Sequence, residues 1–213
     1  MERASMQFAP SLFKRSVLLV KIWANYTARI VGSCHGLLWT YALEVMTLYI
    51  MNCKMGTWKI DPEEVLRVFI EYFSSFDWSR QMITIWGVIP VSKDERGGLK
   101  RARKVEKYVI TPSFLENIRF LLRILANLTN ITPIPDKTFI YDRVNISDPV
   151  LPHNNLGHSV SASNFNRMKL AFNYSAHLLS QNGLAALFRY PTGISPYPSV
   201  SIGIEGESDL RWG

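Results

Sequence analysis

The sequence has few of the residues that build covalent or metal-held scaffolds. It contains two cysteines, Cys34 and Cys53, in 213 residues, and neither lies in a CxxC pair or in a Cys/His cluster. Neither a disulfide framework nor a structural zinc site is therefore expected to hold the fold together. We expect both thiols to be reduced and partly buried.

The sequence also lacks the motifs of several enzyme classes. No D-x-D or D-x-E pair lies on a segment with strand character, and no P-loop, G-x-G-x-x-G or H-E-x-x-H motif occurs. Nucleotidyl transfer needs two or three carboxylates that converge on Mg²⁺. The pair Asp94-Glu95 falls in a basic segment, Glu63-Glu64 follows a helix cap, and the four histidines are scattered. We expect no catalytic residue, no metal ligand and no cofactor in this chain.

No apolar segment has the length of a membrane span or the position of a secretory signal. The first fifteen residues, MERASMQFAPSLFKR, contain no apolar run. The most apolar stretch, Leu37 to Met51, is short and carries Glu44 in its middle, which indicates a buried helix. We expect an intracellular, soluble protein of the nucleus or cytoplasm with no membrane partner.

What the sequence does have is enough apolar material for a core and an excess of positive charge. Hydrophobic residues make up 47% of the chain and aromatic residues 12%, which suffices for one domain. The 24 Lys and Arg against 17 Asp and Glu leave a net charge of +7. This charge suits a polyanionic partner such as RNA, a nucleotide or an acidic membrane surface, although many soluble proteins are as basic.

Apolar periodicity predicts five helices. The third has the clearest start, because Asp61 can cap it, Pro62 suits its first position and Glu63-Glu64 favour the positive end of the helix dipole. The five helices are expected from Pro10-Ser11 to Val31, from Leu37 to Asn52, from Pro62 onward, from Pro112 onward, and from Asn164 to Gln181 before a stop at Gly183.

Two short strands complete the prediction, one at Met82–Trp86 and the other at Phe139–Tyr141. The predicted fold class is α+β, predominantly α-helical, with a single domain and a small strand pair. The predicted boundaries are an N-terminal tail over 1–10, a helical domain over 11–182 that contains a basic loop at 92–108, and a flexible C-terminal tail over 183–213.

Two places on the predicted helices are candidates for phosphate and base contacts. Lys21 lies on the shoulder of the apolar face of the first helix, where it either extends its ammonium to solvent or points it at a phosphate. Thr40 and Tyr41 lie in the first turn of the second helix. A helix start with a hydroxyl binds phosphate, and a tyrosine ring stacks on a base. A tyrosine packed in the core is the alternative.

Two loops are further candidates. The segment DPVLPHNNLGHSVS opens at Asp148 and contains the adjacent Asn154 and Asn155. Asparagine amides read nucleobase edges because each offers a donor and an acceptor, and an asparagine-rich turn is the alternative. The basic loop suggests contacts with RNA or a protein partner through four side chains: Lys100, Arg101, Arg103 and Lys104.

Together these stretches resemble a known family. The segments are FKRSVLLVKIWANYTARIVGSCHGLLWTYALEVMTLYIMN, EEVLRVFIEYFSSFDWSRQMITIWGVIPV and DPVLPHNNLGHSVSASNFNRMKLAFNYSAHLL. They resemble plant proteins of the PAP/OAS1 substrate-binding-domain group, which is related to poly(A) polymerases and terminal uridylyltransferases. The likeness covers about Phe13 to Leu179.

The resemblance implies a helical central domain that forms one wall of a nucleotide cleft. It assigns triphosphate contact to Lys21, phosphate contact to Thr40, base stacking to Tyr41, and base recognition to the loop of Asp148, Asn154 and Asn155. The sequence departs from the family at Asn25, where relatives often carry a second basic residue, and at His158, where the plant pattern tends to arginine.

The resemblance also implies a catalytic α/β domain with metal-binding aspartates, which these residues do not contain. We therefore expect a truncated member or fragment of a nucleotidyltransferase that contacts a nucleoside triphosphate and RNA without catalysing a reaction alone. Mg²⁺ is expected only with the missing catalytic domain, joined in cis. The alternative is a non-enzymatic module that binds RNA or a protein through its basic loop.

Overall fold

The computed structural model describes residues 3–54, 61–91, 110, 112–128 and 138–189. Most of these residues are helical, and the strands form one two-stranded antiparallel sheet. The predicted α+β, mainly helical class is confirmed. The longer elements are α1 (Arg3–Ile22), α2 (Thr40–Cys53), α3 (Pro62–Ser74), β1 (Gln81–Thr84), β2 (Gly87–Pro90), α4 (Pro112–Leu128) and α5 (Ala162–Asn182).

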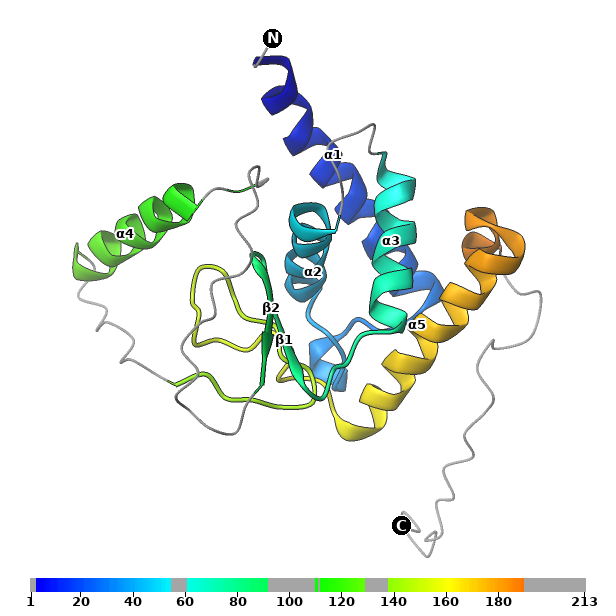
Figure 1. Ribbon diagram of the computed structural model, residues 1–213. Helices are drawn as coiled ribbons and strands as arrows, with labels where there is room; N and C mark the ends of the chain where they lie inside the picture. The colour runs from blue at the N-terminus through cyan, green and yellow to red at the C-terminus, as the bar shows by residue number, and fades with distance from the viewer. Residues whose placement is uncertain (1–2, 55–60, 92–109, 111, 129–137, 190–213) are drawn as a thin grey trace, which may run out of the picture.

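Four of the helices form the body of the molecule. Helices α1, α2 and α3 pack against one another, and α5 packs against α3 (Figure 1). Their shared core is rich in aromatic rings, of which Trp23 is fully buried and donates its indole N–H to the Ser175 hydroxyl at 3.0 Å. Each buried ring removes a large apolar area from water. The largest fully buried aromatic side chains are Trp23, Tyr49, Phe69, Phe73 and Phe172.

Local capping signals place the ends of α3 and α5. The Asp61 carboxylate accepts the backbone N–H of Glu64 at 2.8 Å, and Pro62 occupies the first position of α3. Helix α5 starts with Ser161 as its N-cap, whose hydroxyl accepts the N–H of Asn164, and it stops at Gly183. The predicted cap of α3 and the stop of α5 are confirmed, because both depend on neighbours a few residues away.

Helix α1 differs from its prediction at both ends. It begins at Arg3, so residues 3–10 of the predicted tail are helical. It does not continue as an α-helix to Val31. A π-helical turn over Trp23–Thr27 follows, in which Ala28 donates its N–H to the Trp23 carbonyl at 2.9 Å. Such turns insert a residue and change which side chains share a face.

The strand pair is a hairpin and not the predicted pair. β1 and β2 are joined by Ile85-Trp86, with Met82 opposite Ile89. The predicted strand at Phe139–Tyr141 is wrong, because those residues form no strand. A strand that pairs with a segment two residues further along closes a much shorter loop than one that pairs with a segment more than fifty residues away, and the shorter loop costs less conformational entropy. Residue Ile83 instead forms a parallel bridge to Ile146. Ile83 donates its N–H to the Asn145 carbonyl at 2.8 Å, and the Ser147 N–H donates to the Ile83 carbonyl at 2.9 Å.

The C-terminal part of the described chain is packed beyond the predicted boundary. A 3₁₀ helix, η3 (Leu184–Phe188), follows α5, and its Leu187 is buried while the Leu187 carbonyl accepts the Thr27 hydroxyl at 2.7 Å. The predicted flexible tail therefore does not begin at 183. Residues 190–213 and the basic loop 92–108, including Lys100, Arg101, Arg103 and Lys104, lie outside the described residues.

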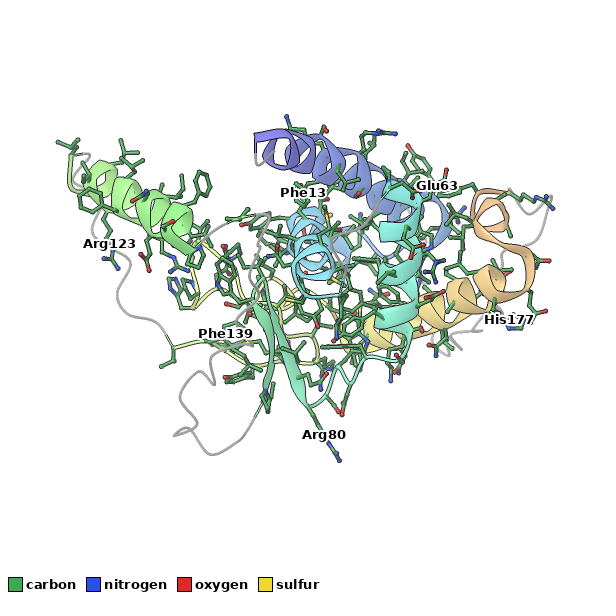
Figure 2. All side chains as sticks on the ribbon, turned by 45° about the horizontal axis from the view of Figure 1, so that its top comes forward. Phe13, Glu63, Arg80, Arg123, Phe139 and His177 are labelled. Atoms are coloured by element: carbon green, nitrogen blue, oxygen red, sulfur yellow. The ribbon has the colours of Figure 1, made fainter. Side chains whose placement is uncertain are left out.

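Helix α4 stands beside the helical body (Figure 1). Leu115, Leu122 and Leu125 recur at helical spacing along α4, but Leu115 is buried whereas Leu122 and Leu125 are 44% and 56% exposed. Figure 2 shows Arg123 pointing away from the body. The periodicity therefore predicts the helix correctly but not which of its turns are covered. No helix in the described ranges has the length and apolar character of a bilayer span.

Candidate functional site

The loop between Val144 and Ser161 is organised around a buried amide. Asn155, which is 4% exposed, accepts the N–H groups of Ile146 and Gly157 at 3.1 and 2.9 Å. Its NH₂ group donates to the Ile140 carbonyl at 3.0 Å and to the Asn145 amide oxygen at 3.2 Å. A buried amide with all its donors and acceptors paired holds a loop in one conformation.

The same loop requires glycine at position 157. A Cβ atom built there would lie 2.3 Å from the Val144 carbonyl oxygen, so any side chain forces the backbone apart. This close approach and the bonds of Asn155 fix the base of the loop. The neighbouring Asn154 is more accessible than Asn155.

Asp148 is the centre of the polar contacts at the top of the loop. It is 6% exposed, and its Oδ1 accepts the N–H groups of Val150 and Leu151 at 2.8 and 3.2 Å. Its Oδ2 accepts the Asn154 NH₂ group at 3.1 Å. The carboxylate therefore organises the next six residues and orients the Asn154 amide.

Tyr41 reaches this carboxylate from the first turn of α2. Its hydroxyl lies 3.4 Å from Asp148 Oδ1, a long and weak hydrogen bond. Partial burial first, and then the negative charge of Asp148 and of Glu44, raise the pKa of Tyr41 to about 12. The tyrosine is therefore neutral at physiological pH. Thr40 is the exposed first residue of the same helix.

Glu44 joins Lys21 to this group of residues. The Lys21 ammonium lies 2.6 Å from Glu44 Oε1, with the two side chains 29% and 36% exposed. Glu44 is one turn after Tyr41 on α2. We name Lys21, Tyr41, Glu44, Asp148 and Asn154 the α2-start cluster. The sequence analysis missed the role of Glu44, although its spacing of three from Tyr41 places both on one helix face.

Asn25 is held by α1 itself. Its NH₂ group donates to the Lys21 carbonyl at 2.8 Å. The position where relatives often carry a second basic residue is thus taken by an amide that bonds to the helix. Lys21 is the cation that the described residues place in the cluster.

Arg119 of α4 is a second residue that the sequence analysis missed. Its guanidinium donates to the Pro149 carbonyl at 2.5 Å, directly after Asp148. An arginine on a largely exposed helix gives no sequence signal of such a contact, which depends on where α4 lies. It connects α4 to the loop that carries Asp148 and Asn154.

The described residues offer no metal site. Within the described ranges, no three His, Cys, Asp or Glu side chains gather in a way that suits a metal ion. The acidic residues of the α2-start cluster are instead engaged with Lys21, Tyr41 and Asn154. No step that depends on a metal is therefore assigned to them.

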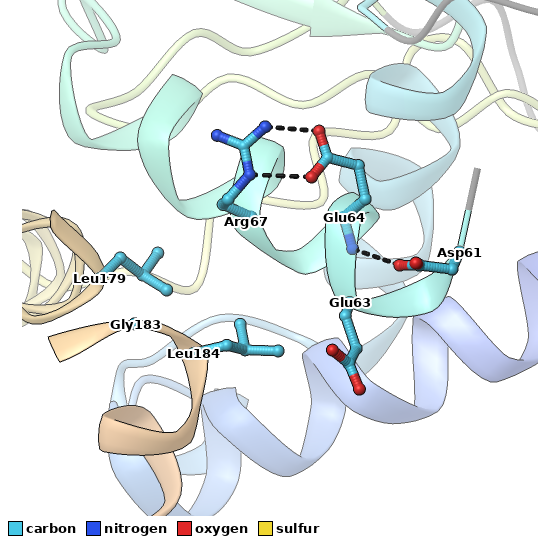
Figure 3. A pocket seen from close by; sticks show the side chains of 7 residues that line it. All are labelled: Asp61, Glu63, Glu64, Arg67, Leu179, Gly183 and Leu184. Atoms are coloured by element: carbon cyan, nitrogen blue, oxygen red, sulfur yellow. Dashed lines mark hydrogen bonds and ion pairs between the residues drawn. The ribbon is translucent and has the colours of Figure 1, made fainter. Parts of the chain in front are cut away.

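A separate pocket of about 220 Å³ lies between the start of α3 and the end of α5 (Figure 3). Arg67 on its wall is paired with Glu64 and Glu71, and Asp61 caps α3. These charges already have partners, and the pocket shares no residue with the α2-start cluster. Its lining residues are Asp61, Glu63, Glu64, Arg67, Leu179, Gly183 and Leu184.

Comparison with known proteins identifies the family. Residues 9–186 match the model of the PAP/OAS1 substrate-binding domain. The chain belongs to this family. No curated protein matches the chain.

Two solved structures share the fold. One is described as a cytoplasmic RNA terminal U-transferase, with 18% identity, a TM-score of 0.52, and coverage of 88% of this chain and 58% of that chain. The other is Cid1, described as having RNA terminal uridylyl transferase activity, with 17% identity, a TM-score of 0.51, and coverage of 91% and 60%. This chain thus spans about three fifths of the length of each. The plant affiliation of the resemblance stays a prediction.

Proposed function

We propose that this chain is the nucleotide-binding helical wall of an RNA 3′-end nucleotidyltransferase. The observation that carries the proposal is the α2-start cluster, in which a cation, a neutral tyrosine and an oriented asparagine amide converge from α1, α2 and the 144–161 loop. Membership of the PAP/OAS1 substrate-binding-domain family supports this assignment.

Each residue of the cluster has a distinct part in the proposed binding. Lys21, held by Glu44, neutralises phosphate charge, and the Thr40 hydroxyl adds a donor at the start of α2. Tyr41 stacks on the base. Asn154 contacts the base edge, and Asp148 sets the orientation of its amide. Asn155 supports the loop from below, because its own polar atoms are all engaged.

In this proposal the chemistry belongs to a catalytic domain that binds Mg²⁺ and acts in cis, and this chain contributes binding alone. The solved relatives are described as acting on RNA by terminal uridylyl transfer, which makes RNA the proposed acceptor and a uridine nucleotide the first to test. Binding of RNA or a protein through Lys100, Arg101, Arg103 and Lys104 stays a prediction.

The test compares UTP with uridine on the unchanged chain and three variants by saturation-transfer NMR, which detects weak ligands. Lys21→Met is expected to weaken UTP binding severalfold and leave uridine binding unchanged, because the ammonium contacts phosphate. Tyr41→Ala is expected to weaken both ligands severalfold, because stacking on a base contributes about 1–3 kcal/mol.

Lys169→Met is the matched control, since it removes the same charge from the exposed Lys169 on α5. It should leave both ligands unaffected. Equal effects of Lys21→Met and Lys169→Met on UTP would mean that net charge alone attracts the nucleotide. Unchanged uridine binding in Tyr41→Ala would reject the base site.

A further inference from the structure

An exposed tryptophan lies immediately before the α2-start cluster. Trp39 is the N-cap of α2 in an extended backbone conformation, and 41% of its surface is exposed. Of the four tryptophans within the described ranges, Trp23 and Trp78 are buried and Trp86 is half-buried, so Trp39 is the most exposed. Its indole N–H has no acceptor among the described residues. Such a ring leaves a large apolar face in water, which is unusual for this residue type.

A second ring meets Trp39 from the 144–161 loop. The centroids of Trp39 and His158 are 5.7 Å apart, with an angle of 52° between the rings. Nδ1 of His158 lies 2.5 Å from the Asn155 carbonyl oxygen. Because a carbonyl only accepts, Nδ1 carries the proton, and Nε2 is left without a partner among the described residues. The two rings are too close to admit a base between them, so a stacked base would lie on the face of Trp39 away from His158, which we call its outer face.

The two segments that carry these rings are pinned together. The Ser159 hydroxyl donates to the Leu37 carbonyl at 2.7 Å, and Ser161 donates its N–H to the Gly36 carbonyl at 3.0 Å. The Asn164 NH₂ group adds bonds to the carbonyls of His35 and Gly36 at 2.9 and 3.1 Å. The rings are therefore held in place before any ligand arrives, which lowers the entropy lost on binding.

The approach of these segments also requires Gly36. Its φ is +70°, a conformation that favours glycine, and a Cβ atom there would lie 3.0 Å from the Ser161 hydroxyl oxygen. The backbone at this point is thus built for close contact between the two segments, and the contact sets Trp39 beside His158.

We propose that Trp39 and His158 form a second base-binding site, in which one base of a single-stranded RNA stacks on the outer face of Trp39. His158 closes one side of this site and offers Nε2 to the ribose or the base edge. An exposed indole ring that is held in place can stack with any of the four bases, as aromatic side chains do in proteins that bind single strands. The inference rests on the proposed function for the class of ligand, whereas its geometry is independent of the Tyr41 site.

The experiment measures binding of a 5′-labelled single-stranded RNA octamer to the intact chain by fluorescence anisotropy. Trp39→Ala is expected to weaken binding about 5- to 100-fold, the range for loss of one stacked base. Trp39→Phe keeps an aromatic face and should stay within about threefold of the unchanged chain. Phe120→Ala is the matched control, because Phe120 on α4 is 62% exposed and lies on a different element. It should have no effect.

Octamers with one abasic position, scanned along the strand, test whether the loss comes from stacking. At the position that stacks on Trp39, removal of the base should weaken binding to the unchanged chain but should cost nothing further in Trp39→Ala. Additive losses at every position, or full affinity of Trp39→Ala, would overturn the proposal, as would a chain that does not bind the octamer. A DNA octamer of the same sequence separates base stacking from contacts with the ribose hydroxyl.

The same variants separate this site from the proposed nucleotide site. Trp39→Ala should bind UTP and uridine as the unchanged chain does, and Tyr41→Ala should retain the Trp39-dependent part of RNA binding. If only Tyr41→Ala loses uridine binding and Trp39→Ala does not affect RNA binding, the proposed function stands and this inference is rejected. If RNA binding depends on Trp39 but the chain binds no nucleotide, this inference stands and the proposed nucleotide site is rejected.

Discussion

Replacement of Asp148 tests the organisation of the 144–161 loop most directly. In Asp148→Ala, the N–H groups of Val150 and Leu151, at 2.8 and 3.2 Å, lose their acceptor, as does the Asn154 NH₂ group at 3.1 Å. Hydrogen bonds to a charged acceptor contribute about 1.5–3 kcal/mol each.

The loss is smaller than the sum of these values. Leu151 is exposed, so water replaces part of its bond, and the Tyr41 bond at 3.4 Å is weak. Removal of a carboxylate that is 6% exposed also relieves its desolvation. We therefore expect Asp148→Ala to lower the free energy of unfolding by about 2–3 kcal/mol, a fall of roughly 4–12 °C in Tm.

Asp148→Asn separates the backbone contacts from the contact with Asn154. Its amide oxygen can still accept from Val150 and Leu151, and Asn154 can turn its own amide to present an oxygen to the new NH₂ group. We expect a loss of about 1 kcal/mol.

Urea denaturation followed by circular dichroism measures all three forms, with Asp142→Ala as the control. Asp142 is exposed and its carboxylate bonds only to Arg143 among the described residues. If Asp148→Ala and Asp142→Ala differ by less than about 0.5 kcal/mol, Asp148 does not organise the loop.

Two further outcomes follow from the same contacts. Arg119→Ala should lower the free energy of unfolding by about 1 kcal/mol and weaken uridine binding, because the Pro149 carbonyl loses its hydrogen bond to α4. The control Arg123→Ala should change neither quantity. Urea denaturation and NMR titration with uridine measure the two effects. The pKa of Tyr41 is raised from its unfolded value of 10 to about 12 in the folded chain. The stabilisation that the neutral Tyr41 gives to the folded state is therefore complete below pH 10 and is lost as the pH rises towards 12. Between pH 10 and pH 12 the free energy of unfolding should therefore fall by about 1 kcal/mol less in Tyr41→Phe than in the unchanged chain, after allowance for solvent screening. Urea midpoints of the two forms that fall by the same amount over this pH range would contradict this.

The sequence by itself determined the features that depend on near neighbours. Asp61 and Pro62 start α3 because a carboxylate caps an N–H three residues away and proline has a helical φ. Gly183 ends α5 with φ +70°, which few other residues adopt. Residue type and position made Lys21, Tyr41 and Asp148 candidates, and the fold brings these residues into one connected group.

Only the tertiary structure decided the contacts between distant segments. Glu44 and Arg119 belong to the site because α1 lies beside α2 and α4 reaches Pro149, which no local pattern encodes. The two asparagines of one dipeptide have different environments for the same reason. Asn155 is enclosed by Ile140, Asn145 and Ile146, whereas Asn154 remains at the loop surface. Burial and hydrogen-bond partners depend on the whole packed chain, so residue type and spacing alone do not separate a supporting side chain from one that is free to bind.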